Sequence, residues 1–203
     1  MRRSNKEYIY DIVFKLFLSK PYEAVTIQDI ETATGMTRGA VFYYAKNKEE
    51  LFKHVVDLYF FKAQSLNDKL DLIKRDSENL LDFIHLYVQA VDRRMSLLQS
   101  LLGYEKAEAS RAYLSFILQA QLYYPGFNEK MNDICDEELD IWESVLLSAQ
   151  ESQEIKSDVD IKSMSRYFRY FYVGMCYLTS LKNGVNIAEL EYNFMKIYAM
   201  IKK

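Results

Sequence analysis

The chain has 203 residues, half of them hydrophobic and 27% charged, with a formal net charge of −3 at pH 7. This composition excludes wholesale disorder and is typical of one large folded domain or two smaller ones. Six glycines and two prolines are few for the turns of a β-sandwich. An all-α fold is therefore expected.

Cysteine and histidine are scarce. Cys135 and Cys176 cannot form a disulfide framework, and His54 and His85 lie in no recognisable metal or triad motif. We expect reduced core thiols, no metal and no cofactor. No signal peptide is recognised at the N-terminus, and the longest uncharged stretch, 112–128, is broken by Pro-Gly. A cytoplasmic protein without a membrane segment is predicted.

Charge is unevenly distributed along the chain. Residues 1–54 hold nine basic and seven acidic side chains, a balance of +2, whereas residues 55–203 carry a balance of −5. A mildly basic N-terminal part on an acidic body is compatible with contact to nucleic acid through the N-terminal part alone.

The first third of the chain shows the spacing and caps of short helices. Thr26 to Asp29 is a capping-box pattern, and Gly35 can end the helix that follows in a left-handed conformation. Asn47 offers a further start, with two acidic residues near the positive end of the helix. The predicted helices are 7–18, Thr26 to about 34, Thr37 to 43 or 44, and Asn47 to about 72.

The remainder is also predicted to be helical, because no alternating pattern is long enough for a strand. Breaks are expected at Gly103, at Pro125-Gly126, around Ser157-Asp158 and at Asn183-Gly184. The predicted helices are 77–95, 97–103, 105–123, 129–152, 160–183 and 187–202.

The two short helices joined through Thr34, Gly35 and Met36 form a helix-turn-helix pattern. The second would lie in a DNA major groove, where Arg38 can donate two hydrogen bonds to a guanine edge. The alternative is a pair of ordinary short helices in a bundle. The predicted DNA-binding residues are Thr26, Gln28, Thr37, Arg38, Gly39, Ala40, Tyr43, Tyr44, Lys46 and Lys48.

Three segments carry a resemblance to a known family. TIQDI at 26–30, TGMTRGAVFYY at 34–44 and KEEL at 48–51 resemble the DNA-binding head of TetR-family transcriptional regulators. The resemblance implies three N-terminal helices that bind DNA, a fourth that connects, and a helical body that binds an effector and dimerises. It implies an effector-controlled repressor or, less often, an activator.

Three positions depart from the family pattern. Glu31 replaces the usual Ala, Phe42 the usual Tyr, and Ala45 a common aromatic residue. The change at Phe42 removes a hydroxyl that often meets a phosphate in the family. Tyr43, Tyr44 or Lys46 can supply that contact instead.

The body is rich in aromatic residues, with 21 of the chain's 30 aromatics after residue 54. Such side chains can line a cavity for an apolar or aromatic effector, although a helical aromatic stripe is more often core. The acidic surplus leaves a cationic effector open. The predicted ligand-binding residues are Phe83, Tyr87, Tyr104, Tyr113, Phe116, Gln119, Tyr123, Trp142 and Phe168.

The last two predicted helices show apolar spacings of three and four, which suit a four-helix bundle made by two subunits. The family resemblance implies the same homodimer, and the alternative is that both seams face the chain's own core. The predicted interface residues are Met164, Phe168, Phe171, Met175, Leu178, Leu190, Phe194 and Ile197.

These features predict a DNA-binding domain at 1–47 and an effector-binding and dimerisation domain at 48–203, connected by the helix from 48 to about 72. The predicted function is a ligand-responsive repressor that binds operator DNA as a dimer and is not an enzyme. A helical interaction module without DNA binding stays open because of Glu31, Phe42 and Ala45. A helical enzyme that uses a body cavity also stays open, but the sequence has no nucleophile–base pair, metal cluster or phosphate loop.

Overall fold

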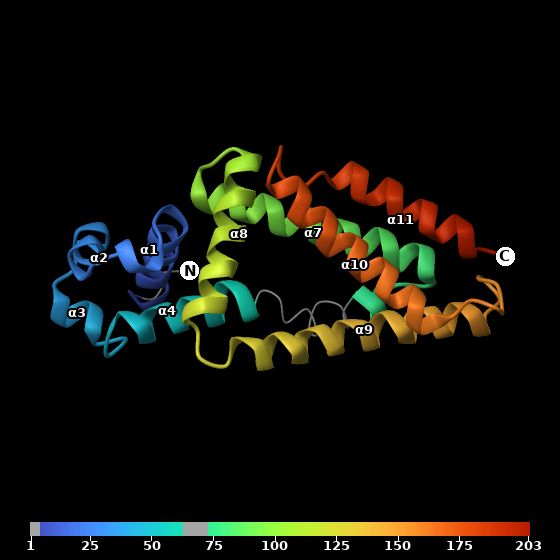
Figure 1. Cartoon of the computed structure of the whole chain (residues 1–203), viewed down its shortest axis with the longest axis horizontal. Helices are drawn as coiled ribbons and strands as arrows, with labels where there is room; N and C mark the ends of the chain where they lie inside the picture. Colours follow the sequence, from blue (N-terminus) through green and yellow to red (C-terminus); the bar gives the residue numbers. More distant parts are fainter. Residues whose placement is uncertain (1–4, 63–72) are drawn as a thin grey trace. The chain divides into compact units, whose positions relative to one another are not determined.

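The computed structural model describes residues 5–62 and 73–203 (Figure 1). Within these ranges the chain is helical apart from turns and one isolated antiparallel bridge between Ile155 and Lys202, so the all-α prediction is confirmed. No helix of the described ranges has the length and apolar character needed to span a bilayer. The N-terminal elements are α1 (Asn5–Ser19), η1 (Tyr22–Ala24), α2 (Ile27–Thr34), α3 (Arg38–Phe42), α4 (Lys48–Val56) and η2 (Asp57–Phe61). The later elements are α7 (Leu80–Leu102), α8 (Lys106–Tyr123), α9 (Phe127–Glu151), α10 (Ile161–Ser180) and α11 (Ile187–Ile201).

Side-chain caps set the ends of the short N-terminal helices as the sequence predicts. The Thr26 hydroxyl accepts from the Asp29 backbone N–H, and the Asp29 carboxylate accepts from the Thr26 backbone N–H at 2.8 Å. Gly35 adopts φ 67° and ends α2. A residue with a Cβ adopts this left-handed conformation only at a cost in conformational free energy. The Asn47 side chain caps α4 by accepting from the Glu50 N–H at 2.8 Å.

Two predicted boundaries differ from the structure. The segments 77–95 and 97–103 form one helix, α7, since nothing near Ser96 interrupts the hydrogen-bonding ladder before Gly103 turns left-handed at φ 68°. The helix predicted from 48 to about 72 is α-helical to Val56 and then continues as the π-helix η2. The last ten residues of that prediction, 63–72, lie outside the described residues.

The chain divides into two compact units, and the division differs from the domain boundary expected at residue 47. Of the described residues, the first unit comprises 5–62 and 112–131, and the second comprises 73–111 and 132–203. Phe116 of α8 explains why a distant segment joins the N-terminal helices. Its ring packs edge-on against Phe14 of α1 at 5.1 Å and against Phe52 of α4 at 5.9 Å between ring centroids.

The second unit is built around Trp142 of α9. The indole is fully buried and stacks on Phe168 of α10 at 4.6 Å between centroids. Phe83 of α7 and Phe194 of α11 form T-shaped pairs with the indole, at 4.9 and 5.9 Å between centroids. One aromatic side chain from each of four helices thus meets at a single point, and truncating such a residue costs about 3–5 kcal/mol of stability.

Gly184 offers a test of the packing at the end of α10. A Cβ there would lie 2.9 Å from the Lys106 carbonyl carbon and oxygen, and the backbone has φ 82°. Gly103 shares the left-handed φ but has open space around it. We expect Gly103→Ala to lower the free energy of unfolding by about 1–2 kcal/mol. Gly184→Ala should lower it by at least ~1 kcal/mol more, because backbone atoms must move.

Urea unfolding of the two variants measures this difference. Equal losses for Gly103→Ala and Gly184→Ala would contradict the close approach of Gly184 to α8.

Candidate nucleic-acid interface

The helix α3 is held by one buried side chain and presents the others to solvent. Val41 is fully buried, whereas Thr37, Arg38, Gly39 and Ala40 are exposed. The Thr37 hydroxyl accepts from the Ala40 N–H at 3.4 Å and so caps the helix. The first turn of α3 therefore offers a cation, a hydroxyl and a stretch of backbone that no large side chain covers.

Aromatic residues flank this exposed turn. The Arg38 guanidinium lies 5.7 Å from the Phe42 ring centroid, within range of a cation–π contact that orients it. Tyr43 is 83% exposed, and its ring meets the half-buried Tyr44 edge-on at 5.1 Å. Lys46 is also exposed. Arginine, tyrosine and lysine together can hydrogen-bond both base edges and phosphates.

Lys48 makes contacts within the fold that the sequence did not predict. Its ammonium donates to the backbone carbonyls of Tyr22 at 2.9 Å and Val25 at 3.0 Å, and it lies 4.3 Å from the Tyr22 ring centroid. The side chain is half-buried. These contacts fix η1 against α4, so Lys48 acts within the fold and Lys46 is the lysine that faces solvent.

Thr26 and Gln28 lie at the exposed start of α2. The Thr26 hydroxyl also donates to Asp29 at 2.8 Å, and Lys20 forms an ion pair with the same carboxylate at 2.7 Å. The Lys20 ammonium and the Thr26 amide and hydroxyl hold the pKa of Asp29 well below its ordinary value. Thr26 is thus engaged in the cap, which leaves Gln28 as the more available group for an outside partner.

The predicted ligand-binding residues separate into two groups. Phe83, Tyr87, Trp142 and Phe168 come together in the second unit, and the half-buried Tyr104 lies between α7 and α8 in the same unit. The structure places the other four with the N-terminal helices of the first unit: Tyr113, Phe116, Gln119 and Tyr123.

Sequence reasoning missed a buried ion pair beside Trp142. Glu138 and Arg169 are both buried, and the Arg169 Nε lies 3.1 Å from the Glu138 carboxylate. The Tyr87 hydroxyl donates to the other carboxylate oxygen at 2.9 Å. Burial is the main cause that raises the pKa of Tyr87, and the negative charge of Glu138 raises it further. Arg169 also donates to the Cys135 sulfur at 2.9 Å. The signal was available, since Glu138 precedes Trp142 by four residues and therefore shares its helix face.

The predicted dimer seam is largely the inner face of α10 and α11. Phe168, Met175, Leu190 and Phe194 are buried in the core of their own unit, so they cannot contact a partner, and this corrects the predicted interface. Leu178 is 57% exposed. The remaining predicted residues, Met164, Phe171 and Ile197, are partly buried.

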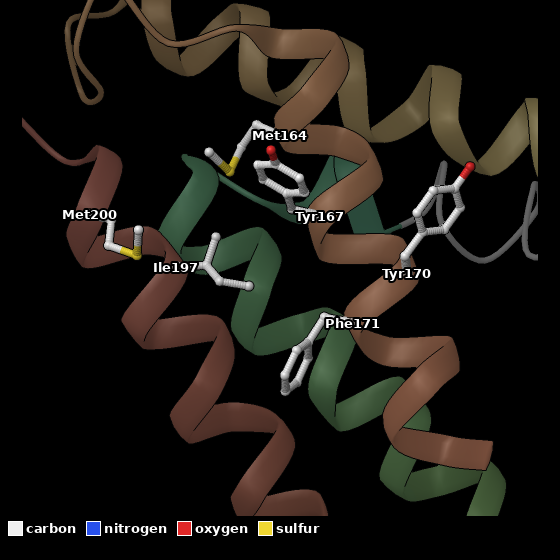
Figure 2. Close-up of a pocket in the computed structure, with 6 residues that line it drawn as sticks. All are labelled: Met164, Tyr167, Tyr170, Phe171, Ile197 and Met200. Atoms are coloured by element: carbon white, nitrogen blue, oxygen red, sulfur yellow. The ribbon is translucent and has the colours of Figure 1, made fainter. Parts of the chain in front are cut away.

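The open face of these helices is apolar and aromatic instead. Met164, Phe171 and Ile197 line a groove between α10 and α11, together with Tyr167, Tyr170 and Met200 (Figure 2). Further exposed large side chains on α10 and just beyond its end are Val173, Tyr177, Leu178 and Leu181. Sequence reasoning missed the tyrosines because their spacing also suits a core stripe.

Comparison with known proteins agrees with this geometry. Residues 9–55 match the family model described as bacterial regulatory proteins, tetR family. The N-terminal domain belongs to the TetR family. AcrR, IcaR and FadR, to which the chain is similar, are all transcriptional regulators by name.

Two curated relatives match part of the chain. AcrR, a transcriptional regulator of Shigella flexneri, is 29% identical over 56 residues, which cover 28% of the chain and 26% of AcrR. IcaR, the negative regulator of the icaADBC biofilm operon in Staphylococcus epidermidis, is 26% identical over 95 residues, covering 44% of the chain and 48% of IcaR. The chain thus aligns with about half or less of these curated relatives.

A solved structure matches over nearly the whole chain. FadR of Bacillus subtilis, in complex with stearoyl-CoA, has a TM-score of 0.66 at 16% identity, covering 95% of this chain and 96% of FadR. At this identity the likeness establishes the fold. The fold shared with FadR therefore extends beyond the N-terminal domain.

The two lysines near α4 give a test of their different roles. We expect Lys48→Met to lower the free energy of unfolding by about 1–2 kcal/mol, because it removes two charge-assisted hydrogen bonds while keeping the alkyl stem on Tyr22. Lys46→Met should leave stability within about 0.5 kcal/mol, since that side chain is exposed.

Thermal and urea unfolding of both variants measure these changes. If Lys48→Met proved as harmless as Lys46→Met, the ammonium would not be holding η1.

Proposed function

We propose that the chain is a ligand-responsive transcriptional repressor that binds operator DNA as a homodimer and is released by a small-molecule effector. The observation that carries this proposal is the exposed first turn of α3, with Arg38 at its start, inside a TetR-family domain. IcaR, one of the relatives, is a negative regulator by name, which supports repression.

In the proposed complex α3 enters the major groove with its first turn against base edges. Arg38 reads a guanine, and Gly39 and Ala40 allow the backbone to approach the bases. Thr37, Tyr43, Tyr44 and Lys46 contact phosphates, and Gln28 reaches the backbone from the start of α2. The phosphate oxygen that Phe42 cannot contact is met by its tyrosine neighbours.

The proposed dimer uses the open face of α10 and α11. The groove at Met164, Phe171 and Ile197 and the exposed tyrosines around it form an almost wholly apolar surface. Such a patch is costly when exposed to water and is typical of a subunit interface. Two heads are also required, because an operator of this kind has two half-sites about one DNA turn apart, ~34–36 Å.

The proposed effector binds in the second unit, at the cluster that contains Phe83, Tyr87, Trp142 and Phe168. Tyr87 links this cluster to the Glu138–Arg169 pair by its hydrogen bond to Glu138. This environment suits an apolar or aromatic molecule that carries one polar group, because each buried polar atom needs a partner. FadR, which binds stearoyl-CoA in its solved structure, offers a large apolar precedent in the same fold. Tyr113, Phe116, Gln119 and Tyr123 have a different role in this proposal, since they contact the N-terminal helices.

Release requires that the effector prefers a conformation whose heads are wrongly spaced for the operator. Its differential affinity for the two conformations sets how far the equilibrium moves. The coupling is reciprocal, so operator DNA weakens effector binding by the same factor.

Selection of bound duplexes from a random DNA pool tests the proposal directly. We expect enrichment of a two-fold symmetric sequence, with affinity that falls steeply as salt rises. A screen of aromatic and apolar molecules for release of that duplex then tests the effector. A pool that yields no enriched sequence at low salt would contradict DNA binding.

The enriched duplex allows Arg38 and Lys46 to be separated. Arg38→Ala should weaken binding to the enriched duplex by about 1–3 kcal/mol and change binding to random DNA much less, because a base contact is lost. Lys46→Ala should weaken both alike and reduce the salt slope by about 1.

Titrations of both variants against both DNAs over a range of salt concentrations measure these effects. Equal losses on the two DNAs for Arg38→Ala would show that it does not read a base.

Self-association gives an independent test. Leu178 on α10 and Leu97 on α7 are 57% and 69% exposed, so an Asp at either position leaves the core intact. Leu178→Asp should raise the dimer dissociation constant by at least about tenfold, because it places a charge in an apolar interface. Leu97→Asp should leave it unchanged.

Sedimentation equilibrium of the two variants and the parent chain provides the measurement. A dimer that tolerates Leu178→Asp as well as Leu97→Asp would place the interface elsewhere.

A further inference from the structure

The three-residue helix η1 connects α1 to α2 and is held by side chains of α8. The Tyr22 N–H donates to the Gln119 side-chain oxygen, and the Tyr123 hydroxyl donates to the Glu23 carboxylate at 2.7 Å. The Tyr22 and Tyr123 rings stack at 4.4 Å with 23° between their planes. All of these residues belong to the first unit. We call Tyr22, Glu23, Gln119 and Tyr123 the η1 latch.

The latch acts on the segment that starts the helix-turn-helix. Val25, the residue after η1, is buried, and the next residue, Thr26, is the N-cap of α2. Lys48 of α4 holds the carbonyls of Tyr22 and Val25 at the same place. The position of η1 sets where α2 begins. Because α2 leads into α3 through a single turn at Gly35, η1 also constrains α3, which we call the recognition helix.

A second set of contacts ties the same part of the chain to η2. The Tyr124 hydroxyl and the Lys130 ammonium both contact the Asp57 carboxylate, at 2.6 and 2.7 Å. The Tyr113 hydroxyl donates to the Tyr59 carbonyl at 3.3 Å. Residues 112–131 therefore contact the N-terminal part of the chain at η2 as well as at η1.

The composition of the latch favours adjustment over permanent attachment. Gln119 and Tyr123 are only half-buried, and Glu23 is exposed. Hydrogen bonds between such side chains contribute about 0.5–1.5 kcal/mol each, which a change elsewhere can outweigh. By contrast, Phe116 of α8 is fully buried against Phe14 and Phe52, and moving it away would expose a large apolar ring. The latch is thus the replaceable part of the attachment.

The helix α8 supplies residues to both units, since 106–111 belong to the second and 112–123 to the first. An α-helix of 18 residues is a stiff rod about 27 Å long.

On these grounds we propose that Gln119 and Tyr123 are positioning residues of the regulator: the η1 latch fixes the angle between α8 and the recognition helix, so that the two heads of a dimer fit both half-sites at once. The inference rests on the proposed function, because it concerns two-headed DNA binding. A latch that opens leaves each head able to bind DNA but lets their relative orientation vary. Simultaneous binding then loses effective concentration.

The test compares a duplex that carries the whole enriched sequence with one that carries a single half of it. Tyr123→Phe removes only the hydroxyl, and Gln119→Met removes the acceptor of the Tyr22 N–H. For the double variant we expect binding to the whole duplex to weaken about tenfold, while binding to the half duplex changes less than about twofold. Gln119→Glu keeps an acceptor oxygen for the Tyr22 N–H, so it should bind the whole duplex more tightly than Gln119→Met does.

Gln121→Met is the matched control, because it removes an exposed side-chain amide from the same helix, α8, two residues from Gln119. It should leave both affinities unchanged, and the single variant Tyr123→Phe keeps the test valid if the double variant is poorly folded. Equal weakening on both duplexes, or none on either, would overturn the latch as a positioning device. If the parent chain binds the whole duplex no more tightly than the half duplex, binding by two DNA-binding domains at once is contradicted. The proposed role of the latch is then contradicted with it.

Discussion

The aromatic core of the first unit is the constraint on which an exposed recognition helix depends. A helix of five residues such as α3 is not stable alone, since nucleation outweighs the few hydrogen bonds it makes. It persists because α1 and α4 meet through Phe14, Phe17, Phe52 and Phe116, with Phe17 edge-on to Phe52 at 4.7 Å. That rigid base lets Ile30 of α2 and Val41 of α3 be fully buried while the opposite side of α3 stays in solvent.

The second unit combines a similar aromatic core with a charged pair that stability alone does not explain. Burying Glu138 and Arg169 costs solvation energy, and apolar residues of similar size often stabilise a core as well or better. Their hydrogen bonds to Tyr87 and Cys135 offset part of that cost and hold the side chains of Glu138 on α9 and Arg169 on α10 in one orientation. A polar group in a core of this kind is a natural contact for an effector, which can exchange hydrogen bonds with it.

The sequence predicted best what depends on local chemistry. The capping box at Thr26, the left-handed Gly35 and the Asn47 cap follow from neighbouring residues, and all three were predictable. Residues whose role depends on distant partners were not. Lys48 was predicted as a DNA contact, and its hydrogen bonds to the Tyr22 and Val25 carbonyls could not be foreseen. Phe116 was predicted to line a ligand site, and its packing against Phe14 could not be foreseen. Four of the eight predicted interface residues are buried in their own unit for the same reason, because an apolar period of three and four marks a buried face without saying what buries it.

The two kinds of contact made by α8 together explain how one helix can both anchor and regulate. If apolar packing alone joined it to the head, any reorientation would expose large rings such as Phe116, and the cost would lock the arrangement. If polar contacts alone joined it, exchange with water would leave the head without a defined position. With Phe116 as a pivot and Gln119 and Tyr123 as exchangeable hydrogen-bonding groups, rotation about the pivot costs only a few hydrogen bonds that water can replace. In the proposed regulator, a modest difference in effector affinity between two conformations is then sufficient to change the relative orientation of the two DNA-binding domains.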